Sequence, residues 1–341
     1  MNSQSINSVE LLKLPKSSNI LQSQYWGNLK GAFGWTPYSF EYNGMALLVL
    51  LRKVFGKYSI AYIPHGPDLG SDDQRGSKLK EIGLEVKKNL PKGCFALRFD
   101  LPSGLFTTEP VKFNMGPELK KASSDIQPPD TVFVSLKETE DNIMGRMKSK
   151  TRYNIRLSFR KGVIVTKEGV DSLDKWYDLY CETAVRDKIT IHSKEYYKKV
   201  FELSAENAKV SENPEIALFQ AAYNNKILAG IIVSIYGTRA TYLYGASSNE
   251  HRNLMPAYAL QWEAIKYAKA RGCTEYDLFG IPPVNDPEHP MIGLYRFKTG
   301  FGGDILHRPG CWDLPLKPVV YMVYRWAESV RLFYYKKIRK K

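Results

Sequence analysis

The stretch ATYLYGASSNEHRNLMPAYALQWEAIKYAKARGCTEYDLFGI, residues 240–281, decides the fold. It begins with the strand-like run ATYLYGASS. Residues 256–271 then place apolar side chains at helical spacing, and Gly272 follows as a stop signal. The run EYDLFGI, residues 275–281, has the composition of a further strand. A strand, an amphipathic helix and another strand therefore follow one another here.

This order of elements occurs twice in the chain. In the second half, helical patterns at 172–186 and 194–204 precede three strand-like runs joined by NN and GTR turns, and the helix and strand of 256–281 follow. In the first half, three strand-like runs precede a helical pattern at 72–89 and the strand CFALRFDL. No residue-level repeat accompanies this order. The repeated order of elements predicts a duplicated α/β module.

Length and charge set the broad class of the protein. A chain of 341 residues exceeds what one hydrophobic core organises, and we expect a first domain at 1–141, with 310–341 packed back on it, and a second at 142–309. The net charge of +14 suits phosphate-rich partners or an anionic membrane, although solubility alone also explains it. No signal peptide is evident, and the longest apolar run, 45–51, is far shorter than the roughly 20 residues of a membrane span. We therefore expect a cytoplasmic protein.

A basic helix is predicted over residues 138–161. Its apolar residues recur at near-helical spacing: Met144, Met147, Ile155 and Phe159. Its cations fall at every fourth position: Lys148, Arg152, Arg156 and Arg160. In one continuous helix these cations form a ridge about 18 Å long, because each residue advances the helix by about 1.5 Å. Such a ridge suits contact with a polyanion.

A second amphipathic helix is predicted for the tail, residues 318–341. One face carries apolar side chains and the tail ends in YYKKIRKK. Two interpretations stay open: the helix lies on an anionic membrane surface, or it packs on the first domain with a solvated charged end.

The predicted order of strands and helices is that of the GNAT acetyltransferase fold. An acyl-CoA enzyme of this fold is expected to hold the pyrophosphate on a glycine-rich turn at the helix N-terminus. Here the junction reads YGASSNEHRNLMPAYALQW, and proline removes a backbone donor from that turn. An acyl-CoA N-acyltransferase is therefore the alternative of the same fold, disfavoured by this junction.

Six segments carry a more specific resemblance, in one order along nearly the whole chain: SQYWGNLKGAFGW, FALRFD, MKSKTRYNIRLSFRKGV, LYCETAVRDKITIHSKEYY, YLYGASSNEHRNLMPAYALQWEAIKYA and LYRFKTGFGG. Through them the chain resembles the FemABX family of peptidoglycan bridge-forming aminoacyltransferases. The resemblance implies an α/β (α+β) fold of two GNAT-like domains around a cleft. No room remains for a coiled-coil arm, so the chain resembles the short, armless FemX-like type.

The resemblance implies the reaction and its partners. An amino acid passes from aminoacyl-tRNA to the stem-peptide amine of a peptidoglycan precursor, either lipid II or UDP-MurNAc-pentapeptide. Because the aminoacyl ester is already activated, no metal and no cofactor is expected, and the protein supplies approximation and charge stabilisation. Peripheral contact with the inner membrane surface is a further possibility. A non-catalytic tRNA- or membrane-binding relative is the alternative from another class.

Residues of the first domain are assigned to the precursor through the same resemblance. Lys30, flanked by Trp35, matches a lysine that contacts precursor phosphates, although an exposed helix lysine is the plain alternative. Arg98 and Asp100 share one face of a strand; Asp100 is expected to orient the acceptor amine as a catalytic residue, and an ion pair at the strand end is the alternative. Phe95 matches an aromatic position of the precursor pocket, and its pattern also suits a core residue.

In the second domain, Phe297 and Lys298 match the pair that assists catalysis. A fixed ammonium stabilises a tetrahedral oxyanion or terminal tRNA phosphates, and the phenyl ring offers a stacking surface for the terminal adenine. The plain alternative is a surface loop.

Tyr258 matches a position that lines the cleft. His192 stands where the family carries a phosphate-binding arginine, and because histidine is the weaker cation, Arg186 or Lys194 is the alternative source of charge. The four-cation ridge of the basic helix is assigned to tRNA.

Overall fold

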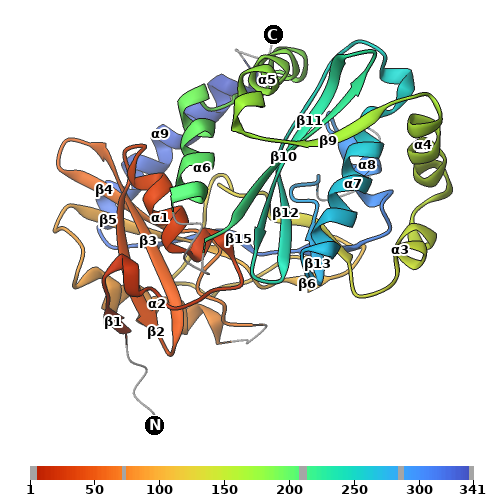
Figure 1. Ribbon diagram of the computed structural model, residues 1–341. Helices are drawn as coiled ribbons and strands as arrows, with labels where there is room; N and C mark the ends of the chain where they lie inside the picture. Colours follow the sequence, from red (N-terminus) through yellow and green to blue (C-terminus); the bar gives the residue numbers. More distant parts are fainter. Residues whose placement is uncertain (1–5, 71–73, 207–212, 283–287, 338–341) are drawn as a thin grey trace. The chain divides into compact units, whose positions relative to one another are not determined.

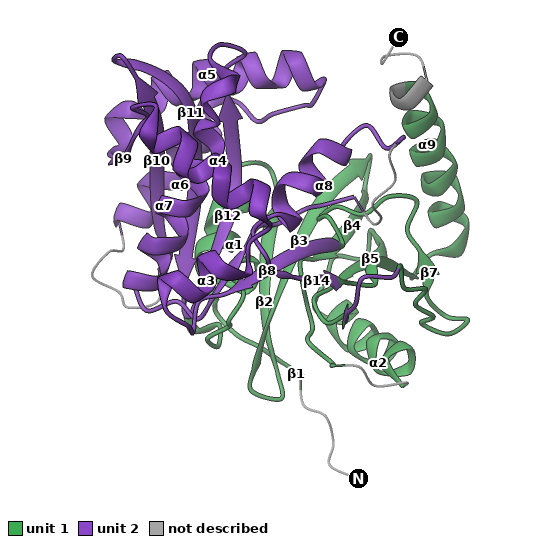
Figure 2. Ribbon diagram, turned by 90° about the vertical axis from the view of Figure 1, so that its right-hand side faces the viewer, with its two compact units in different colours: residues 1–105, 110–129, 307–341 green, residues 106–109, 130–306 purple. Residues whose placement is uncertain are grey.

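The computed structural model of the protein describes residues 6–70, 74–206, 213–282 and 288–337. The chain forms two compact units (Figures 1 and 2). Unit 1 contains residues 1–105, 110–129 and 307–341, and unit 2 contains 106–109 and 130–306. The C-terminal segment thus belongs to the first unit. Residues 130–141, expected in the first domain, belong to the second, because β8 (Asp130–Ser135) pairs with β13 (Glu275–Asp277) of that unit.

Unit 1 contains a seven-stranded sheet with the order β1-β2-β3-β4-β5-β15-β7. Neighbouring strands are antiparallel except β4 and β5, which are parallel and are connected by α2 (Arg75–Lys87). The strands are β1 (Ile6–Ser8), β2 (Thr36–Tyr42), β3 (Met45–Phe55), β4 (Tyr58–Ile63), β5 (Cys94–Leu101), β7 (Lys120–Lys121) and β15 (Gly310–Pro315). The other helices are η1 (Leu11–Lys13), η2 (Ile20–Gln22), α1 (Gln24–Gly31) and α9 (Pro318–Lys337).

Unit 2 contains an eight-stranded sheet with the order β6-β14-β8-β13-β12-β11-β10-β9. Here β12 and β13 are the parallel pair, connected by α7 (Pro256–Ala270). The remaining strands are β6 (Leu105–Phe106), β9 (Ile164–Glu168), β10 (Glu215–Tyr223), β11 (Lys226–Tyr236), β12 (Arg239–Ser247) and β14 (Asp304–His307). The other helices are α3 (Glu140–Arg146), α4 (Ser149–Arg160), η3 (Val170–Ser172), α5 (Leu173–Asp187), α6 (Lys194–Glu206), η4 (Arg252–Leu254) and α8 (Ile292–Thr299).

The two units share one order of elements. In each, a three-stranded antiparallel meander leads into a helix and then into a strand parallel to the last strand of the meander. Each unit also buries its own apolar cluster. In unit 2, Trp176 lies against Gly230, where a Cβ atom would come within 2.6 Å of the indole ring. This arrangement confirms the duplicated α/β module predicted from element order.

The single basic helix predicted over 138–161 is wrong. The helix is interrupted at Met147 and Lys148, whose ψ angles of 150° and 144° are extended. The turn after α8 packs into the interruption: the Lys148 N–H donates to the Gly300 carbonyl at 2.9 Å, and a Cβ atom on Gly302 would lie 2.4 Å from the Arg146 carbonyl. Long-range packing therefore holds this break, and Gly145, two residues before it, is a local signal that the prediction did not use.

The interruption also removes the predicted four-cation ridge. Lys148 is the N-cap of α4, and its ammonium lies 3.4 Å from the Thr299 hydroxyl. Arg152 turns back to donate to the Gly145 carbonyl at 3.2 Å and to the Met147 carbonyl, so it caps α3. Arg156 and Arg160 are exposed on α4, and so is Phe159, which was expected on the apolar face.

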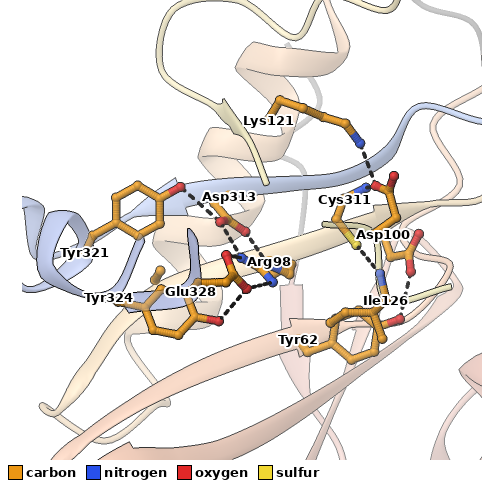
Figure 3. A network of polar contacts seen from close by, with 12 residues as sticks. Tyr62, Arg98, Asp100, Lys121, Ile126, Cys311, Asp313, Tyr321, Tyr324 and Glu328 are labelled. Carbon is orange, nitrogen blue, oxygen red and sulfur yellow. Dashed lines mark hydrogen bonds and ion pairs between the residues drawn. The ribbon is translucent and has the colours of Figure 1, made fainter. Parts of the chain in front are cut away.

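A buried ion-pair network fastens α9 to β5 (Figure 3). The Arg98 guanidinium donates to both oxygens of Asp313, at 2.7 and 2.8 Å, and to both oxygens of Glu328, at 3.0 and 3.3 Å. The side chains of all three residues are at most 3% exposed. Arg98 and Asp100 do share one face of β5, as predicted. Arg98, however, is engaged by two carboxylates of its own chain, which corrects its assignment to substrate binding.

Phe95 lies beside this network. Its ring is fully buried and lies 5.1 Å from the ring of Tyr324 on α9, measured between centroids. Together with Tyr321 it belongs to a small apolar cluster under the helix. The assignment of Phe95 to a precursor pocket is therefore corrected in favour of the core interpretation.

Among the helices that the structure describes, none combines the length and the apolar composition needed to cross a bilayer.

We predict that Arg98→Met lowers the free energy of unfolding of unit 1 by about 3–5 kcal/mol, because it leaves two buried carboxylates without their cation. The matched control is Lys88→Met, which removes a cation whose pair with Glu85 is exposed and costs about 0–1 kcal/mol. Urea denaturation of the purified chains measures both values. Equal stability of the two variants would contradict the anchoring role.

Candidate active site

In unit 2 the parallel strands part in the middle of the sheet. β12 pairs with β13 only from Arg239 to Thr241, although β12 continues beside β11 as far as Ser247. The register of β12 against β11 shifts between Tyr242 and Tyr244, which marks a bulge where the pairing with β13 ends. A bulge re-aims the side chains around it. The Lys298 side chain reaches the chain just beyond the end of this pairing, at Phe279 and Gly280.

Lys298 is a buried lysine on α8. Its side chain is 6% exposed, and its ammonium donates to the carbonyls of Phe279 and Gly280, at 2.8 Å each. The nitrogen also lies 5.1 Å from the centroid of the Tyr242 ring. Burial lowers the pKa of Lys298 to about 7, although the charge of Asp277 opposes the shift. No carboxylate of the described residues forms an ion pair with it.

The backbone after β13 is shaped to receive this lysine. Phe279 has a φ of 55°, a left-handed conformation that is uncommon for an aromatic residue. The Asp277 carboxylate stabilises it by accepting a hydrogen bond from the Phe279 N–H at 2.8 Å, and it also accepts one from the Thr131 hydroxyl. Two consecutive carbonyls thereby face the lysine. An ammonium has three N–H donors, so one donor beyond these two is available for a ligand oxygen.

A cluster of aromatic rings joins α7 to the C-terminal end of α8. The Phe297 ring is half-buried and lies 4.9 Å from the Tyr258 ring in an edge-to-face arrangement, and Phe301 lies 5.3 Å from Phe297. The Tyr258 hydroxyl bonds to the buried Asn154 of α4. The structure thus brings together two residues predicted from the resemblance, Phe297 and Tyr258, and the third, Lys298, follows Phe297 on α8.

The glycines after Lys298 serve packing within unit 2. Lys298 lies on a helix and is buried, so the alternative of a plain surface loop is wrong. A Cβ atom on Gly300 would lie 2.3 Å from the Thr151 hydroxyl, and one on Gly303 would lie 2.4 Å from the Phe133 carbonyl. These residues fix α8 against α4 and β8.

The junction between β12 and α7 does not have the form of a pyrophosphate-binding turn. The described residues there form the short helix η4, and Met255 takes a left-handed φ of 54° before Pro256 begins α7. No side chain caps this helix start. Since proline has no N–H to donate, the first turn of α7 offers one donor fewer to an anion.

Unit 1 carries a second cluster of cations and aromatic rings, which we call the basic-aromatic patch: Trp26, Lys30, Trp35 and Arg52. The Lys30 ammonium lies 4.6 Å from the Trp26 ring centroid, and the Arg52 guanidinium lies 5.3 Å from that of Trp35. Burial, together with the charge of Arg52, lowers the pKa of Lys30 to about 8. The Trp26 indole N–H is buried and has no hydrogen-bond partner among the described residues. A ligand oxygen would satisfy it.

Local structure explains why these side chains meet. Trp26 and Lys30 are four residues apart on α1 and share one face of it. Gly34, with a φ of 82°, reverses the chain, and the Trp35 N–H donates to the Lys30 carbonyl at 3.2 Å. Arg52 was not predicted from the sequence. Arg52 is the first charged residue after the apolar run MALLVLL, and this position could have marked it. Thr36 pairs with Leu51, so extending the β2–β3 register by one residue places Arg52 opposite Trp35.

Asp100 lies deeper in unit 1 than its predicted role requires. Its carboxylate is 1% exposed and accepts hydrogen bonds from the Tyr62 hydroxyl at 2.8 Å and from the Gln127 N–H at 3.2 Å (Figure 3). Burial raises the pKa of Asp100 to about 6 against these hydrogen bonds. The Tyr62 ring lies 6.0 Å from that of Trp35. The expected role of Asp100 toward an acceptor amine stays a prediction; in the structure its carboxylate holds the hydroxyl of Tyr62, whose ring adjoins Trp35 of the patch.

His192 is exposed immediately before α6, with its ring stacked on Tyr196 at 3.9 Å. The two alternative cations are occupied by their own unit. Arg186 bonds to Asp187 and to the Ser247 carbonyl at 2.6 Å, and Lys194 pairs with Asp174 at 3.1 Å. The phosphate-binding role of His192 stays a prediction.

Solved structures place the fold in a known class. A crystal structure of FemX matches with a TM-score of 0.75 at 19% identity, covering 94% of this chain and 100% of that one. A tandem GNAT protein from the clavulanic acid biosynthesis pathway matches with a TM-score of 0.51 at 10% identity, covering 92% and 98%. The chain is therefore a protein of two GNAT-like domains, as predicted.

Sequence comparison identifies the family. The profile of the FemAB family matches residues 115–211 and 204–329, which is more than half of the 341 residues. The chain belongs to the FemAB family. Proteins named lipid II:glycine glycyltransferase from Staphylococcus aureus strains MSSA476 and MRSA252 are each 23% identical over 392 aligned positions, covering 92% of this chain and 91% of each relative. Because the alignment is longer than this chain, the relatives contain residues that it lacks.

We predict that two lysines titrate far below the ordinary value of about 10.4: Lys298 near 7 and Lys30 near 8. Between pH 7 and about 10.4 the unfolded chain then binds more protons at Lys298 than the folded one, so this residue's contribution makes folding more favourable as pH rises through that window.

NMR titration of the lysine side chains measures both values. Lys298→Met should remove the resonance with the lowest midpoint and Lys30→Met the next one. A spectrum in which every lysine titrates near 10.4 would refute the burial argument for both.

Proposed function

We propose that this chain is an aminoacyltransferase of cell-wall synthesis. It would transfer an amino acid from aminoacyl-tRNA to the stem-peptide amine of a peptidoglycan precursor, either lipid II or UDP-MurNAc-pentapeptide, at the cytoplasmic face of the membrane and with peripheral membrane contact. The observation that carries the proposal is the buried Lys298 at the parting of β12 and β13, with Phe297 beside it. Membership of the FemAB family and the names of the relatives support the reaction class.

In the proposed reaction, the acceptor amine attacks the carbonyl carbon of the aminoacyl ester. The carbon–nitrogen bond forms, the bond to the ribose oxygen breaks, and the amine proton passes to that leaving oxygen. The third N–H of the Lys298 ammonium donates to the oxyanion or to a terminal phosphate, and an anion there raises the pKa of the lysine and so favours its charged form. Phe297 and Tyr258 offer the terminal adenine an aromatic surface.

The basic-aromatic patch of unit 1 is proposed to bind the precursor. Two phosphates next to a sugar present anionic oxygens beside the C–H face of the sugar ring. Lys30 and Arg52 complement the anionic oxygens, and Trp26 and Trp35 complement the C–H face. The free indole N–H of Trp26 adds a neutral donor. Arg156 and Arg160 of α4 are the remaining candidates for tRNA contact. The shared cleft between the domains stays a prediction.

Transfer is tested by mass spectrometry of the precursor after incubation with the protein and mixed aminoacyl-tRNAs. The mass gained by the precursor names the amino acid, and the two acceptor forms are supplied in separate reactions. No mass gain on either precursor, with folded protein, would contradict the proposal. Tight binding of acetyl-CoA in calorimetry would instead favour the acyl-CoA alternative.

We predict that Lys298→Met lowers the transfer rate by about 10²–10³-fold, because a preorganised donor to the oxyanion is lost. The control Lys88→Met, at the exposed residue that follows α2, should retain the wild-type rate. Circular dichroism checks that both variants fold. An unchanged rate in Lys298→Met would support the non-catalytic alternative.

A further inference from the structure

Helix α9 turns an apolar face away from the unit to which it belongs. Its inward face packs on unit 1. Tyr321 is buried there at 4% exposure, Glu328 accepts hydrogen bonds from Arg98, and the Tyr324 ring packs against Phe95. Its other face exposes large apolar side chains: Val319 69%, Met322 62%, Val323 55%, Trp326 71%, Val330 49% and Phe333 56%. The packing that the sequence left open is thus present, yet it uses only one side of the helix.

The exposed residues form one continuous stripe. Apart from the neighbouring pair Met322 and Val323, they follow one another at intervals of three or four residues over about four turns, which keeps them on one side of an α-helix. The stripe is centred opposite the anchored face, so the ion-pair network that holds α9 to β5 also fixes the direction of the stripe. Among the described residues it is the longest series of large exposed apolar side chains on a single helix. A contiguous apolar surface of this kind marks an interaction site.

The charged residues around the stripe indicate which kind of partner it binds. From residue 317 to residue 341 the sequence contains eight Lys and Arg residues but a single acidic residue, Glu328. That carboxylate is buried against Arg98, so the outward side of the helix presents no acidic group of its own. Arg331 is exposed and Arg325 is half-buried at the flanks of the stripe. Residues 338–341, which carry three of the cations, lie outside the described residues.

We propose that the outward face of α9 lies in the headgroup region of an anionic lipid bilayer. Trp326, Phe333 and the aliphatic side chains would enter the boundary of the acyl chains, and the flanking cations would meet lipid phosphates. The choice of the cytoplasmic leaflet rests on the proposed function, whereas the binding surface itself rests on α9 alone. Such docking would hold the enzyme where a lipid-linked acceptor is found.

A second copy of the chain fits the stripe less well. A symmetric dimer places the same surface on both partners, so two α9 helices packed through this face would bring Arg325 and Arg331 of each copy together. No carboxylate on the outward side of the helix offsets that repulsion. Anionic lipid neutralises the same charges. The charge distribution therefore favours the bilayer.

Vesicle co-sedimentation tests the proposal. The probe is phosphatidylglycerol–phosphatidylcholine vesicles, compared with vesicles of phosphatidylcholine alone. The wild-type chain should bind the anionic vesicles and release them as salt is raised, and the double variant Trp326→Ser/Phe333→Ser should bind at least about tenfold more weakly. Both replaced side chains are exposed, so folding should persist. The matched control is Val185→Ser, which replaces an 81%-exposed apolar residue on α5 and should bind like wild type.

Three results would overturn the proposal: no binding of the wild-type chain to anionic vesicles, equal binding by the double variant, or a concentration-dependent dimer that the double variant abolishes while vesicle binding is absent. Transfer to the soluble UDP-MurNAc-pentapeptide, assayed without vesicles, separates this question from the proposed function. If the double variant retains that transfer but loses vesicle binding, both proposals stand. If wild type binds vesicles but transfers nothing, only the proposed function fails.

Discussion

A lysine ammonium held by two backbone carbonyls inside an aromatic setting is the interaction on which the candidate site depends. Lys298 has this position only because β12 and β13 stop pairing after Thr241 and Asp277, and because the backbone after β13 takes a left-handed turn at Phe279. Desolvation makes the charged form of such a group costly. An anionic ligand beside Lys298 would stabilise its charged form, so this position is suited to bind negative charge.

Unit 1 has the same order of elements as unit 2, but its cations lie elsewhere. In unit 1 the chain after β4 stays beside β5, where the Gly66 N–H donates to the Asp100 carbonyl at 2.9 Å. Its cations gather instead between α1 and β3, where Lys30 and Arg52 lie over tryptophan rings. One duplicated architecture thus provides two unlike cationic clusters, which we propose as sites for anions. A transferase that must hold a charged donor and a charged acceptor has a use for both.

The sequence predicted the parts of the structure that depend on local pattern. The duplicated order of elements, the helix at 256–271 and the shared face of Arg98 and Asp100 all follow from periodicity, and they are confirmed. Resemblance supplied Lys298 and Phe297; the structure buries Lys298 and places the Phe297 ring next to Tyr258. What the sequence could not show was burial.

The errors share that physical cause. Arg98 and Phe95 have the pattern of a half-exposed strand, but α9, more than 200 residues further along the chain, covers them. The break between α3 and α4 arises from the glycines after α8, which no local signal connects to it. Arg52 was missed for the converse reason, since only the pairing of β2 with β3 brings it to Trp35.

Proton uptake on donor binding is the sharpest test of whether the buried Lys298 receives an anion. Calorimetry of an aminoacylated tRNA acceptor stem at pH 8, repeated in buffers of different ionisation enthalpy, counts the protons bound with the ligand. With a pKa of about 7, Lys298 is mostly neutral at pH 8 and must take up close to one proton when an anion occupies its site. We predict that uptake in the wild-type chain and its loss in Lys298→Met. Binding without proton uptake, or with equal uptake in the variant, would contradict the account.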